Sequence, residues 1–150
     1  MKEYRSYDEN LKLGKKYEDF IKCILKEKFN YNLHPYKTKE GQYEFGENKE
    51  GIEIKYDNIM KRTGNIYIEI AEKTNKNNLN FIPSGIYRND NSIWYLIGDY
   101  QTIYIFKIKD LRQAYEDEYY YMLKENPTSK GFLLSKIQAR ILANKLYTII

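Results

Sequence analysis

The chain has 150 residues and a formal net charge of +4 at pH 7, with 42% hydrophobic and 31% charged residues. This length is enough to bury a core and predicts one domain spanning residues 1–150. Its single cysteine excludes an intramolecular disulfide and a cysteine-rich metal cluster. The N-terminus lacks an apolar signal region, and no apolar run approaches the roughly 18 residues of a membrane span. We therefore expect a soluble cytoplasmic protein that does not engage a membrane.

The first predicted element is an amphipathic helix. Apolar side chains recur at i, i+3 and i+4 from about Asn10 to Lys28, which is the spacing of one helix face. The following residues, 31–41, include Pro35 and predict a loop.

Alternating patterns then predict strands. Residues 42–48 and 51–57 flank a turn at 48–51 and predict a β-hairpin, and residues 64–73 predict a third strand. The polar stretch 75–91 contains Pro83 and Gly85 and predicts a loop or an edge element. Two more strands are expected over 92–99 and 102–109, with a turn at Tyr100–Gln101 between them.

The C-terminal part is predicted to be helical. One helix is expected to start near Asp110, to cover residues 111–125 and to end before Pro127, because proline cannot continue a helix. A final helix over 135–150 would have Ser135 as its N-cap. This order of elements predicts an α/β or α+β domain with a mixed central β-sheet flanked by helices.

The second strand of the predicted hairpin carries charge along one face. Because the side-chain period of a strand is 2, Glu53 and Lys55 share one face and two isoleucines share the other. In a simple two-residue hairpin Glu44 lies opposite Lys55, and a slip of one residue replaces Glu44 with Glu47. Two carboxylates and a lysine on rigid strands are suited to binding Mg²⁺ or Mn²⁺ and to hydrolysing a phosphodiester.

An acid, a hairpin and then Glu-x-Lys on the next strand resemble the PD-(D/E)xK nuclease superfamily. The match is "YEF" or "GEN" followed by "EIK", and "GIEIKYD", "TGNIYIEI", "PSGIY" and "WYLIGDY" resemble a phage or mobile-element branch over residues 14–134. The resemblance implies a restriction-endonuclease-like core and a Mg²⁺- or Mn²⁺-dependent DNA endonuclease in the cytoplasm of a bacterial or phage-infected cell. It implies a catalytic set of Glu44, Glu53, Lys55 and Glu18, and a metal site formed by Glu53 with Glu44 or Glu47.

Basic residues near the strands are candidates for phosphate contacts. Lys61 and Arg62 lie in the loop after the second strand, and Lys73 ends the third strand, where it could also join a rival acid–lysine pair. A solvated loop is the alternative for Lys61 and Arg62. Asp57 and Glu69 continue the polar strand faces, and we expect them to support the site from outside or to lie on the surface.

Three alternatives to a nuclease stay open. Glu53 and Lys55 could form only a solvated ion pair on a strand face. The superfamily usually has aspartate as its first acid, so a glutamate there favours a catalytically silent module that binds DNA or RNA. The 17 tyrosines also allow a phage protein-interaction factor. If the chain is a nuclease, cleavage of both DNA strands would need a homodimer or successive nicks.

Overall fold

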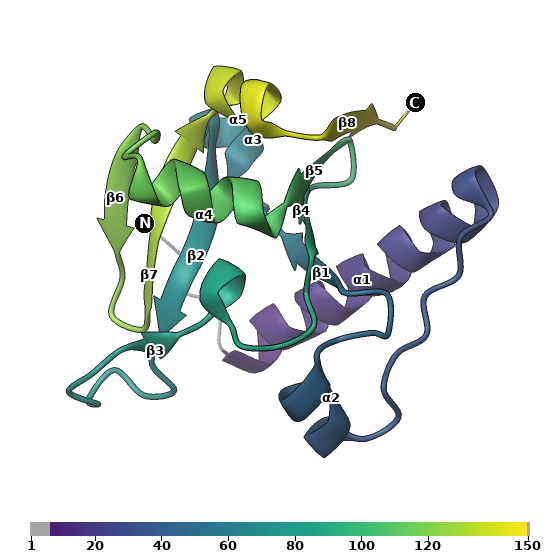
Figure 1. The fold of residues 1–150 in the computed structure, drawn as a ribbon, viewed down its shortest axis with the longest axis horizontal. Helices are drawn as coiled ribbons and strands as arrows, with labels where there is room; N and C mark the ends of the chain where they lie inside the picture. Colours follow the sequence, from purple (N-terminus) through teal and green to yellow (C-terminus); the bar gives the residue numbers. More distant parts are fainter. Residues whose placement is uncertain (1–6, 150) are drawn as a thin grey trace.

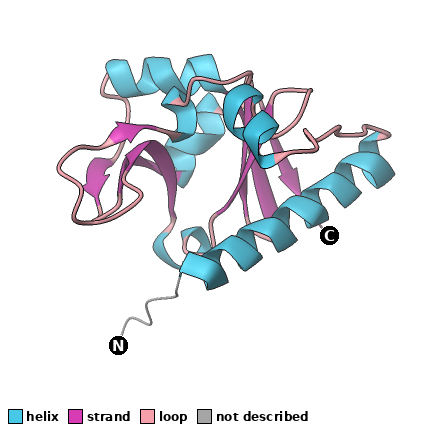
Figure 2. Ribbon diagram, turned by 90° about the horizontal axis from the view of Figure 1, so that it is seen from below, coloured by secondary structure: helices cyan, strands magenta, loops and turns pink. Residues whose placement is uncertain are grey.

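The computed structural model describes residues 7–149, apart from the side chains of Tyr7 and Tyr43. Within this range, five α-helices surround eight strands that form two four-stranded sheets (Figures 1 and 2). The helices are α1 (Tyr7–Phe29), α2 (Lys39–Phe45), α3 (Met60–Thr63), α4 (Ile108–Glu116) and α5 (Lys136–Leu142), with one 3-10 turn, η1 (Gly85–Tyr87). The strands are β1 (Ile52–Tyr56), β2 (Asn65–Glu72), β3 (Ile82–Pro83), β4 (Trp94–Gly98), β5 (Thr102–Lys107), β6 (Met122–Glu125), β7 (Ser129–Ser135) and β8 (Lys145–Thr148). Over these residues, no helix has the length and apolar character needed to cross a bilayer.

The two sheets differ in how their strands run. The first sheet has the order β1-β4-β5-β8, with β1 parallel to β4 and the other two pairs antiparallel. The second sheet has the order β3-β2-β7-β6 and is antiparallel throughout. The helices and strands confirm the predicted α+β class, but the strands form two sheets instead of the single mixed central sheet that was predicted.

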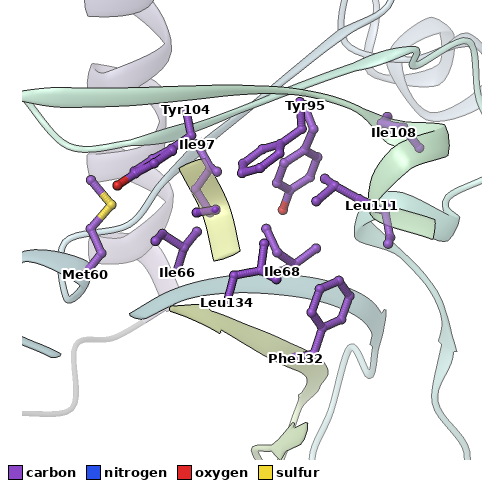
Figure 3. Close-up of a cluster of buried hydrophobic side chains, with 13 residues drawn as sticks. Met60, Ile66, Ile68, Tyr95, Ile97, Tyr104, Ile108, Leu111, Phe132 and Leu134 are labelled. Atoms are coloured by element: carbon purple, nitrogen blue, oxygen red, sulfur yellow. The ribbon is translucent and has the colours of Figure 1, made fainter. Parts of the chain in front are cut away.

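The core lies between the two sheets and also beneath α1. On β4, Tyr95 and Ile97 point towards Ile66 and Ile68 of β2 (Figure 3), whereas Leu96 packs in the cluster under α1. Both faces of the first sheet are therefore covered. This explains why its central strands read as almost continuous apolar runs instead of alternating ones.

The predicted hairpin is wrong in its first strand. Lys39–Phe45 form the helix α2, whose N-cap Thr38 accepts a hydrogen bond from the Gly41 N–H at 3.0 Å. A threonine cap and the helix-forming Lys, Glu and Gln side chains outweigh the apolar alternation that favoured a strand. The second strand, β1, forms as predicted but pairs in parallel with β4, about forty residues further along the chain.

The C-terminal helices are shorter than predicted. The helix α4 ends at Glu116, and Glu118 adopts a positive φ of 56° that turns the chain towards β6. Pro127 lies in the turn between β6 and β7, two strands that the sequence reasoning missed. Ser135 does cap α5, in a capping box with Gln138, but that helix ends at Leu142 and β8 follows.

Candidate functional site

The charged face of β1 brings Glu53 and Lys55 together, as predicted. Lys55 Nζ lies 3.2 Å from Glu53 Oε1, and their side chains are 37% and 2% exposed, respectively. Burial raises the pKa of Glu53. Burial acts to lower the pKa of Lys55, but the Glu53 charge and further acidic groups outweigh it and hold that pKa well above its usual value. The second oxygen of Glu53, Oε2, is buried and has no hydrogen-bond partner among the described residues.

Two more carboxylates lie close to this pair. Glu47 precedes β1, and its Oε2 accepts a hydrogen bond from the Ile54 N–H at 3.3 Å. Burial raises the pKa of Glu47 to about 7, helped by repulsion from Glu53 and Glu18 and opposed by Lys55. Burial also raises the pKa of Glu18, which α1 contributes. Of the two candidates for the first acid, Glu47 and not Glu44 is thus the one that lies near Glu53 and Lys55.

Part of the cluster borders a groove with a volume of about 1150 Å³ between α1, residues 35–42 and β1, whereas the buried Glu53 is not in its lining. Glu18, Glu47 and Lys55 line it, together with five other basic side chains: Lys15, Lys22, Lys37, Lys39 and Arg88. Arg88 is fixed in place by a 2.7 Å hydrogen bond to the Gln42 carbonyl. Six basic against two acidic side chains give the described lining a positive balance, which attracts polyanions.

Four of the predicted site residues lie elsewhere. Glu44 is exposed on α2, so the predicted cross-strand pairing that would bring it to the cluster is not formed. Lys61 and Arg62 belong to α3, before β2, whereas Lys73 follows β2. These three therefore lie at opposite ends of one strand, and none of them is in the lining of the groove. Lys73 Nζ instead lies 4.3 Å from the centre of the Phe81 ring.

Asp57 and Glu69 make structural contacts. Asp57 Oδ1 accepts hydrogen bonds from two backbone N–H groups at the start of α3, at 2.9 and 3.0 Å, and its Oδ2 accepts one from the Tyr67 N–H at 3.2 Å. The carboxylate of Glu69 accepts hydrogen bonds from the hydroxyls of Ser84 and Ser129 at 3.1 and 3.0 Å. Asp57 thus joins the end of β1 to α3 and β2.

The sequence reasoning missed the basic walls of the groove. Lys15, Glu18 and Lys22 have the i, i+3, i+7 spacing of one helix face, a signal that could have placed them together. Lys37 follows Pro35, which forms an isolated β-bridge with Asn48 in the segment before β1. No local pattern predicts that contact.

The possible metal-ligand atoms of the cluster are chemically suited to a hard divalent cation. They are carboxylate oxygens, the ligands that Mg²⁺ prefers. The unused buried Oε2 of Glu53 and the raised pKa of Glu47 are features that a bound cation would relieve. Over residues 7–149, however, no group of three or more His, Cys, Asp or Glu side chains is already arranged to hold a metal ion.

Comparison with known protein families, with curated proteins and with solved structures gives no match to this chain. The fold and the site define the chain as an α+β protein in which a buried glutamate pairs with a half-buried lysine that lines a basic groove.

Proposed function

We propose that the chain is a metal-dependent DNA endonuclease of the PD-(D/E)xK type, with a restriction-endonuclease-like core. The observation that carries the proposal is the groove in which Glu47 and Lys55 lie beside Glu53 and among basic side chains. The basic walls would hold phosphates, and the acid–lysine cluster would act on the phosphodiester between them.

In this proposal each residue of the cluster has a defined role. Glu47 and Glu53 would hold Mg²⁺ or Mn²⁺, with Glu18 as an auxiliary carboxylate and Glu47 in place of Glu44 as the first acid. The bound ion would polarise the phosphodiester and make water a better nucleophile. Lys55, which stays protonated, would neutralise charge on the phosphate. The enzyme would act in the cytoplasm, and two copies would be needed to cut both strands in one event.

A cleavage assay tests the proposal. Supercoiled, linear, single-stranded and branched DNA are incubated with Mg²⁺, Mn²⁺ or EDTA. We expect cleavage only with the metals, and its loss in Glu47→Gln and in Lys55→Ala while DNA binding is retained. The matched control is Glu44→Gln, an exposed glutamate on α2, which should cleave like the parent chain. Full activity of Glu47→Gln, or cleavage in EDTA, would reject this mechanism.

A second candidate is a nucleic-acid-binding module without catalysis. It is favoured by the ion pair that already occupies one oxygen of Glu53 and by the missing three-ligand group within residues 7–149. Calorimetric titration with Mn²⁺ separates the two functions. If the chain is a nuclease, Mn²⁺ binding should give a heat signal that Glu53→Gln abolishes. If it is a module without catalysis, it should bind DNA but give no heat signal with Mn²⁺.

A further inference from the structure

The basic groove also contains aromatic rings. Tyr36 and Tyr56 both line it, Tyr36 from the segment after α1 and Tyr56 from the end of β1. They thus occupy the same groove as Lys55 and the cations of its walls. Phosphates bind basic side chains, backbone N–H groups and hydroxyls, including those of tyrosine, so a site for phosphates alone does not require aromatic ring faces.

Each ring is held in place by a second aromatic ring. The ring of Tyr36 lies 5.5 Å from that of Phe45, and the ring of Tyr56 stacks on Tyr17 at 4.9 Å between centroids. The backbone is fixed as well, because the Gln42 side chain donates a 3.0 Å hydrogen bond to the Tyr36 carbonyl. A ring that is already ordered loses little side-chain entropy when a ligand stacks on it.

Unpaired cations lie along the same walls. Lys22, Lys37 and Lys39 form no ion pair with any residue of the described range 7–149. The volume of the groove, about 1150 Å³, exceeds the roughly 300–1,000 Å³ of a pocket for one drug-sized ligand. It therefore has room for an extended chain of anionic groups.

Proteins bind single-stranded nucleic acid in grooves that combine basic side chains along the phosphate backbone with aromatic rings on which the bases stack. In a duplex each base is stacked between its neighbours, so a side chain cannot cover its face. In a single strand the bases can separate and stack on tyrosine. We propose that this groove binds single-stranded nucleic acid, with phosphates on its lysines and bases stacked on Tyr36 and Tyr56. The inference rests on the proposed nucleic-acid function and names its substrate class.

Fluorescence anisotropy with a labelled oligothymidine and a duplex of equal length tests this inference. All titrations contain EDTA, so the result does not depend on a metal or on cleavage. We expect tighter binding of the single strand. Tyr36→Leu should weaken it about 5- to 150-fold, the effect of one base stacked on a ring, whereas Tyr36→Phe should keep the affinity. Duplex binding should be unchanged in both variants.

Two further sets of variants complete the test. Tyr121→Leu is the matched control, because Tyr121 is 62% exposed and lies outside the groove lining, and it should bind like the parent chain. Tyr56→Leu repeats the test on the other wall if Tyr36→Leu fails to fold. Lys37→Ala should weaken single-strand and duplex binding alike and should reduce the salt slope by about 0.7–0.9.

The outcomes separate the inference from the enzymatic proposal. Tighter duplex binding, or unchanged single-strand affinity in both leucine variants, would overturn the inference and leave a nuclease for duplex DNA intact. Single-strand binding that depends on the tyrosines, without cleavage of any substrate, would support the inference and remove the enzymatic function. Failure to bind any nucleic acid at low salt would overturn both.

Discussion

The Ile54 N–H donates a hydrogen bond to Glu47 Oε2 at 3.3 Å, on the open edge of β1. The neighbouring Asn48 does the same for Ile52: its Oδ1 accepts from the Ile52 N–H at 2.9 Å, and its Nδ2 donates to the Ile52 carbonyl at 2.7 Å. Two side chains thus satisfy backbone groups that a paired strand would otherwise satisfy. This arrangement protects the edge of β1 from pairing with another strand, and it also places the Glu47 carboxylate near Lys55.

The raised pKa of Glu47 predicts that stability falls as the pH rises. The folded chain holds the Glu47 proton up to about pH 7, whereas the unfolded chain releases it near the ordinary value of 4.5. The contribution of the Glu47 proton to the free energy of unfolding is therefore complete below pH 4.5. It is lost as the pH rises towards 7, and the loss is at most about 3 kcal/mol. Urea unfolding in EDTA from pH 4 to 8 measures it. The difference between the parent chain and Glu47→Gln should change over this window, and a difference independent of pH contradicts the prediction.

The ion pair of Glu53 and Lys55 predicts that losing the lysine alone destabilises the chain more than losing both charges. Lys55→Ala leaves a nearly fully buried carboxylate without its cation. Because Lys55 is 37% exposed, the cost should lie between about 1 kcal/mol for a surface pair and about 3–5 kcal/mol for a buried one. Adding Glu53→Gln should recover part of the loss, since no buried charge remains. A double-mutant cycle in urea checks this, and strictly additive losses would show that the pair is not coupled.

The sequence could predict those elements whose patterns are local. The helix α1 and the strands β1, β2, β4 and β5 follow from apolar periodicity, and the cap of α5 follows from Ser135. The pairing of Glu53 with Lys55 follows from their spacing of two on one strand. Each of these predictions depends only on neighbours along the chain.

What could not be predicted depends on contacts between distant segments. The strand β1 pairs with β4 rather than with its neighbour in sequence, and β8 pairs with β5. Short segments such as 39–45 and 122–125 are ambiguous, because their apolar residues fit a helix or a strand until tertiary packing decides. The groove has the same origin, since α1 and residues 35–42 meet only in the folded chain.

Asp57 is predicted to stabilise the junction of β1, α3 and β2. Asp57→Ala removes the acceptor of three backbone hydrogen bonds and should cost about 3 kcal/mol, whereas Asp57→Asn keeps one oxygen acceptor and should cost less. Urea unfolding gives both values. Asn58→Ala, at an exposed neighbouring position, is the control and should change stability by less than about 0.5 kcal/mol. Equal stability of Asp57→Ala and the control would rule out this role.

Two glycines should respond to alanine in opposite directions. Gly14 lies in α1, and a Cβ built there meets no atom within 4 Å, so Gly14→Ala should stabilise the chain by about 1 kcal/mol through helix propensity. Gly85 has a φ of 56°, and its Cβ would lie 2.1 Å from the Glu69 carbonyl oxygen. Gly85→Ala should therefore cost more than about 2 kcal/mol, because left-handed strain adds to a clash with backbone. Thermal unfolding of both variants checks the signs. A neutral Gly85→Ala would mean that η1 does not pack against β2 as closely as the structure places it.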